Sequence, residues 1–143
     1  MNKFTKFLKL NPADKRLYFQ ALFTSTKVKL MVTLLPLRWY AHYLGKEHSV
    51  TIDHFIDDSY PVIYKVSQAI VRGQKSVPWQ NRCLVNAITA KLMLRKKGLE
   101  STLYLGVNKE NQKMKAHAWL RCGTFYVTGQ RGMEKFVVVN TFA

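Results

Sequence analysis

The hydrophobic pattern of the chain changes at Gly98, and this change constrains the fold more than any other feature of the sequence. Before Gly98, apolar residues recur at the three- and four-residue intervals of helices. After it, short runs rich in β-branched and aromatic residues cover 101–107, 116–122 and 124–129, and a further run at 136–140 can form a last strand. Because helices precede strands that short segments connect, the sequence predicts an α+β fold with an antiparallel sheet.

Caps and helix breakers divide the first half of the chain. Asn11 can cap a helix that has Pro12 at its first position, and helical spacing continues from there to Pro36. Two further helices are expected, with an acidic loop between them. Their ranges are 37–44 and 61–72, with Gly73 just past the end of the second, and the loop covers 46–59.

One more helix is expected after Asn81, a good N-terminal cap, and Gly98 terminates it. If Asn81 is the cap, Cys83 lies in the first turn, where unpaired backbone N–H groups and the helix dipole favour a thiolate. The same N–H groups can later stabilise an oxyanion. The predicted buried stripe of this helix consists of Leu84, Ala87, Ile88, Leu92 and Met93 or Leu94.

Length and composition indicate one globular domain over 1–143, with a helical front half at 1–73 and a cysteine-bearing helix plus sheet at 79–143. The hydrophobic content is 48%, which argues against disorder. Cys83 and Cys122 are the two cysteines, so no disulfide framework is expected and the chain is predicted to be cytoplasmic. The histidines show no metal-ligand spacing, and neither a metal nor a cofactor is expected.

The net charge of +15, from 23 basic and 8 acidic residues, predicts acidic partners or a broadly solvated cationic surface. Residues 95–97, Arg-Lys-Lys, form the clearest basic cluster. No recognised nucleic-acid motif is present, so specific nucleic-acid binding is not expected. The most hydrophobic stretch, 28–44, contains Lys29, Pro36 and Arg38, so a membrane span is not expected, and no signal peptide is evident.

Cys83 lies in the sequence Trp-Gln-Asn-Arg-Cys-Leu-Val-Asn-Ala, and His117 lies in Ala-His-Ala-Trp-Leu. Together with 92–98, 102–107 and the front-half segments 11–16 and 34–36, these motifs resemble the stand-alone transglutaminase-like leader peptidase of lasso peptide biosynthesis. The resemblance covers essentially the full length of the chain. It implies a papain-like fold and makes Cys83 the nucleophile and His117 the general base of a cysteine peptidase.

The resemblance also implies a substrate and partners. The substrate is a ribosomally made precursor peptide, whose leader the peptidase removes. The freed amine of the core peptide is then joined to an acidic side chain by a separate ATP-dependent cyclase. Because the helical front half begins almost at Met1, no room is left for the recognition domain of fused relatives, and a small separate leader-binding protein is expected to deliver the substrate.

The third catalytic group is where the chain departs from this family, which usually has an aspartate on the strand after the histidine. The corresponding strand here, 125–130, contains no carboxylate. If 123–124 form a two-residue turn, the antiparallel register pairs His117 with Gln130, which is then the first candidate to orient the imidazole. A one-residue slip would reverse this assignment. The runners-up are Thr128, Asn140 and Glu134.

Other residues near the cysteine and the histidine are candidates for substrate contacts. Trp79 precedes the cysteine helix and Trp119 shares the strand face of His117, so each either lines the substrate cleft or packs internally. Gln80, with the backbone N–H of Cys83, is a candidate for the oxyanion hole. Cys122 lies on the opposite strand face from His117 and is expected in the core.

Two other functions remain open from the sequence. A transglutaminase or amidase would use the same cysteine and histidine and form the same acyl-enzyme, but with a different amide substrate or acyl acceptor. A non-catalytic basic module would instead bind nucleic acid or the acidic surface of a partner, and the high net charge supports it.

Overall fold

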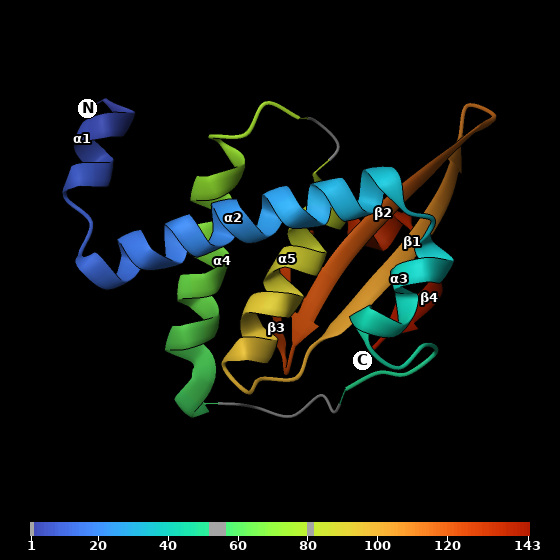
Figure 1. Cartoon of the computed structure of the whole chain (residues 1–143). Helices are drawn as coiled ribbons and strands as arrows, with labels where there is room; N and C mark the ends of the chain where they lie inside the picture. The colour runs from blue at the N-terminus through green and yellow to red at the C-terminus, as the bar shows by residue number, and fades with distance from the viewer. Residues whose placement is uncertain (1, 52–56, 80–81) are drawn as a thin grey trace.

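The computed structural model describes residues 2–51, 57–79 and 82–143, and in these residues helices precede strands (Figure 1). Short 3₁₀ turns occupy Asp57–Ser59 and Met133–Lys135. The α+β fold predicted from the sequence is confirmed. The helices are α1 (Lys3–Leu8), α2 (Pro12–Leu34), α3 (Leu37–Leu44), α4 (Tyr60–Gln74) and α5 (Cys83–Lys96), and the strands are β1 (Thr102–Glu110), β2 (Lys113–Cys122), β3 (Phe125–Thr128) and β4 (Val137–Phe142).

Helix α5 forms the centre of the core, between the sheet on one side and helices α2 and α4 on the other (Figure 1). A helix covered on several sides is apolar around most of its circumference rather than along one stripe. Leu84 and Leu92 of the predicted stripe are accordingly only half-buried, whereas Val85 and Ala90, outside that stripe, are buried. The prediction of one apolar face was therefore too narrow for this helix.

Most helix ends lie where local sequence signals place them. The Asn11 side chain accepts a hydrogen bond from the backbone N–H of Asp14 at 2.8 Å, and α3 ends at Gly45. The predicted end of α4 was wrong, because the helix continues through Gly73 to Gln74. Gly73 is buried against Ala21 of α2, and this packing offsets the low helix propensity of glycine.

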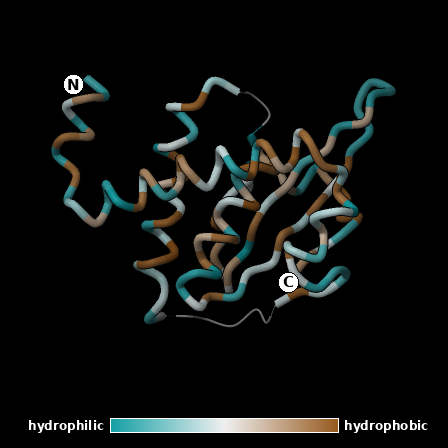
Figure 2. The backbone as a smooth tube through the Cα atoms, in the orientation of Figure 1, coloured by the Kyte–Doolittle hydropathy of each residue, from teal (hydrophilic) through white to brown (hydrophobic). Residues whose placement is uncertain are grey.

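The sheet is antiparallel, with strand order β3-β2-β1-β4. Strands β1 and β2 are longer than predicted, since the expected loop at 108–115 forms a hairpin closed by Asn111 and Gln112, both with positive φ. The hairpin tip is hydrophilic (Figure 2) and its residues are exposed. Backbone pairing and the ion pair from Lys115 to Glu110, at 3.0 Å, hold this tip together, so it gives no hydrophobic signal in the sequence.

The register of β2 assigns its residues to two faces. Ala118, Leu120 and Cys122 lie in the core shared with α5, whereas His117 and Trp119 lie on the other face. Cys122 is 1% exposed and its thiol donates to the carbonyl of Glu100, in agreement with the expected core position. The described helices include none long and apolar enough to cross a membrane.

Candidate active site

Cys83 is the first residue of α5 and carries a free, half-buried thiol. Arg82 is the N-cap, and a backbone bond runs from the N–H of Asn86 to the Arg82 carbonyl at 2.7 Å. The N–H groups at the start of a helix lack intrahelical acceptors in general, and the positive end of the helix dipole lies beside the thiol. The predicted cap Asn81 and the oxyanion-hole candidate Gln80 lie outside the described residues.

His117 is held by a main-chain group. Its Nε2 lies 2.7 Å from the carbonyl oxygen of Gly129. A carbonyl oxygen can only accept a hydrogen bond, so Nε2 carries the proton, and Nδ1 of the neutral ring is left as the basic nitrogen. The rings of Trp119 and Phe136 lie 5.7 and 5.1 Å from the imidazole, centroid to centroid, and limit its rotation.

Two glycines shape the surroundings of the imidazole. Gly129 has φ +72°, and a Cβ there would come within 2.4 Å of the Ala118 carbonyl oxygen. Gly106, which pairs with His117 across β1 and β2, leaves room that a Cβ would take from Trp119 and Phe136 at 2.9 Å. The close approach of the Gly129 carbonyl to the ring therefore depends on glycine at that position.

The predicted pairing of His117 with Gln130 was wrong. The turn after Cys122 forms as expected, but the register shifts between Leu120 and Arg121, so that Leu120 pairs with Thr128. Strand β3 then ends at Thr128, before it reaches the level of His117. A bulge of this kind adds one residue to one strand and changes every pairing beyond it.

The side chains considered for the third catalytic position do not bind the imidazole in the described structure. Gln130 and Glu134 are exposed, while Asn140 donates to Glu47 at 2.7 Å on β4. The Thr128 hydroxyl oxygen is buried and, among the described residues, has no hydrogen-bond partner. The acceptor that does bind His117 belongs to the backbone of Gly129, which no side-chain motif could have identified.

A pocket of about 200 Å³ lies between α4, α5 and β3. Asn86, one helical turn after Cys83, lines one side, and Gly129, whose carbonyl holds His117, lines another. Cys83 and His117 are not among its lining residues, and the pocket is linked to them through Asn86 and Gly129. No hydrogen bond joins the Cys83 thiol to His117 in the described part of the chain.

The two tryptophans have packed positions. Trp79 is half-buried and lines a small cavity of about 10 Å³ against α2, and its carbonyl accepts a 2.8 Å bond from Nε of Arg82. Trp119 is 5% exposed and stacks between Tyr104 and His117. In this structure Trp119 therefore supports the imidazole from within the fold rather than offering its own surface to a ligand.

Within the residues that the structure describes, no cluster of three or more His, Cys, Asp or Glu side chains could hold a metal ion. The half-buried thiol at a helix N-terminus and the oriented imidazole are groups suited to acyl transfer. Comparison with known proteins gives a match of residues 31–141 to the model of the transglutaminase-like superfamily. No curated protein and no solved structure matches the chain.

Proposed function

Because the chain belongs to the transglutaminase-like superfamily, we propose that it is a cysteine peptidase that removes the leader from a ribosomally made lasso precursor peptide. Cys83 is the nucleophile and His117 the general base. The observation that carries this proposal is the half-buried thiol at the start of α5 together with an imidazole that the Gly129 carbonyl orients. Asn86, one turn after the thiol, and Gly129 line the same pocket.

The reaction begins with transfer of the Cys83 thiol proton to Nδ1 of His117. The thiolate attacks the scissile carbonyl, and first-turn N–H groups of α5 stabilise the oxyanion. The imidazolium donates its proton to the leaving amine, which frees the core peptide and leaves the leader as a thioester on Cys83. Water, deprotonated by His117, then hydrolyses the thioester and releases the leader as a carboxylate.

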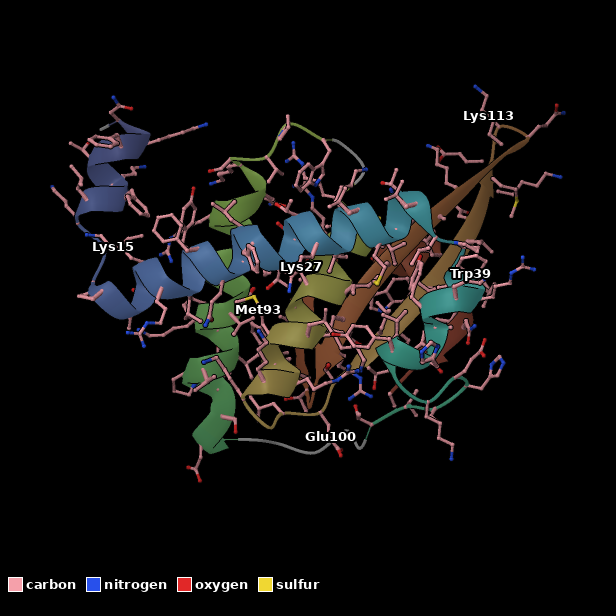
Figure 3. The ribbon with its side chains drawn as sticks, in the orientation of Figure 1. Lys15, Lys27, Trp39, Met93, Glu100 and Lys113 are labelled. Atoms are coloured by element: carbon pink, nitrogen blue, oxygen red, sulfur yellow. The ribbon has the colours of Figure 1, made fainter. Side chains whose placement is uncertain are left out.

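The proposed peptidase acts with a separate leader-binding protein, and a separate ATP-dependent cyclase uses the freed amine. The surface charge supports docking of an acidic leader or partner: Lys27 on α2 and Lys113 at the hairpin tip are both exposed, on distant parts of the molecule (Figure 3). Such long-range attraction steers association and weakens with salt. Complex formation that does not change with ionic strength would argue against this role of the charge.

The proposal is tested by co-expression of the chain with the precursor and the leader-binding protein. Native protein is compared with Cys83→Ala and with the matched control Cys122→Ser, and intact masses of the peptides are recorded. Cys83→Ala and His117→Ala should stop leader release, whereas Cys122→Ser should retain it. Leader release by Cys83→Ala would show that the proposal is wrong.

The superfamily match leaves the acyl acceptor to be identified, since transglutaminases pass the same acyl group to an amine. Repeating the reaction with added methylamine distinguishes a peptidase from a transglutaminase. A peptidase gives the leader as the free acid, whereas a leader recovered mainly as its methylamide would identify a transferase.

A further inference from the structure

The pocket between α4, α5 and β3 has an uncharged lining, although the chain as a whole carries a net charge of +15. Its polar side chains are amides and hydroxyls, together with the apolar surface of Ile70, Val71 and Val127. The polar lining residues are Ser67, Gln74, Asn86, Tyr126, Thr128 and Gln130.

The polar groups of the lining differ in whether they already have a hydrogen-bond partner. Asn86 Nδ2 donates to Gln74 Oε1 at 2.7 Å, which leaves the Asn86 oxygen and the Gln74 amide nitrogen able to bind a further group. The Thr128 hydroxyl oxygen, by contrast, is buried with no partner among the described residues. Burying a hydroxyl without a hydrogen bond costs free energy of folding. The Thr128 hydroxyl therefore points to a bound group that supplies the missing hydrogen bond.

We propose that this pocket binds an uncharged, hydrogen-bonding side chain of the substrate, on a residue next to the scissile bond. This inference rests on the proposed function, because the position near the scissile bond follows from two lining residues: Asn86, one turn after Cys83, and Gly129, which binds His117. A carboxylate or an ammonium group would lose its hydration there without gaining a counter-charge. An alkyl side chain would leave the Thr128 hydroxyl unpaired.

The test uses binding rather than cleavage, so that it does not depend on catalysis. The Cys83→Ala protein, labelled with ¹⁵N and ¹³C, is titrated with acetamide, acetate and methylammonium, and NMR shifts are followed at Thr128, Gly129 and the Asn86 side chain. Acetamide should shift these signals in a saturable way. Acetate and methylammonium should leave them unchanged, even where acetate shifts signals of surface lysines.

A matched pair of variants separates pocket binding from a change in stability. Thr128→Val keeps the shape of the side chain and removes the hydroxyl, and it should weaken acetamide binding by about tenfold. Ser101→Ala removes the other buried hydroxyl that has no partner among the described residues, away from the pocket, and should leave the affinity unchanged.

Equal binding of acetate and acetamide at the pocket, or equal affinity of native and Thr128→Val proteins, would overturn the inference. Either result leaves the proposed peptidase activity standing, since that activity is decided by leader release with and without Cys83. Conversely, leader release by Cys83→Ala removes the proposed function, whatever the titration shows.

Discussion

The Nε2 atom of His117 lies 2.7 Å from the carbonyl oxygen of Gly129, so a main-chain group orients the imidazole. A carbonyl fixes the ring orientation and the tautomer, as a carboxylate does. It carries no full negative charge, however, and therefore stabilises the imidazolium less. The strand after His117 can thus lack an acidic residue and still present a basic Nδ1.

Substitution of Gly129 tests this arrangement. Gly129→Ala places a Cβ within 2.4 Å of the Ala118 carbonyl oxygen, so the backbone must shift and the bond to His117 is lost. Because the imidazole then loses the group that orients it, we expect leader release to fall at least about tenfold. A tenfold loss corresponds to about 1.4 kcal/mol. The ¹⁵N shifts of the imidazole should also change from one Nε2-protonated tautomer to a mixture.

Gly132→Ala is the matched control for this change. Gly132 also has a positive φ, of 83°, so alanine is strained there too, by about 1–2 kcal/mol. A Cβ at this position would meet no atom of the described residues within 4 Å beyond its chain neighbours, and the His117 contact is not involved. Equal loss of activity in the two variants would mean that backbone strain, and not the carbonyl contact, is responsible.

Gln130→Ala distinguishes the carbonyl from the amide that the sequence favoured. Since Gln130 is exposed and β3 ends before it, its removal should leave the ¹⁵N tautomer pattern of His117 unchanged. A shift of that pattern toward a tautomer mixture would restore Gln130 as the orienting group.

The two thiols should differ sharply in reactivity. Cys83 is half-buried at a helix N-terminus, whereas Cys122 is 1% exposed and burial raises its pKa. Brief treatment of the folded protein with iodoacetamide should therefore add one label, on Cys83, as located by peptide mass mapping. Labelling of Cys122 at the same rate would contradict the packing described for β2.

Lys91 should make stability depend on pH. Its side chain is 3% exposed and donates to the Ser101 carbonyl at 2.5 Å, and burial is the main cause that lowers its pKa to about 8. Between pH 8 and 10.5 the unfolded chain binds more protons at this group, so its contribution to stability rises with pH.

Urea unfolding of native protein and Lys91→Met at several pH values measures this contribution. The free energy of unfolding of the native protein should increase relative to that of Lys91→Met as the pH rises from 8 toward 10.5. Lys96→Met, at an exposed position of the same helix, is the control. A constant difference between native protein and Lys91→Met over this range would contradict the prediction.

Features set by local chemistry could be predicted from the sequence. Asn11 caps α2 through its own side chain, and Gly98 has the positive φ that ends α5. Cys83 begins a helix and His117 lies on a strand as predicted, although the N-cap of α5 is Arg82, without a side-chain cap bond, and not the predicted Asn81.

Features set by main-chain or tertiary contacts could not be predicted from the sequence. The register shift near Leu120 moves Gln130 away from His117, and nothing in the alternating pattern marks that bulge. The Gly129 carbonyl has no side chain to recognise. The pocket combines Gln74 with Asn86 and Thr128, which three separate elements bring together only in the folded chain.

The most direct test of the account is to trap the acyl-enzyme. The chain, the precursor and the leader-binding protein are mixed and quenched in acid within the first turnover, and the intact mass of the chain is measured. The account predicts a thioester adduct of the leader, located on Cys83 by digestion and absent from Cys83→Ala. Leader release without any adduct, or an adduct on another residue, would contradict it.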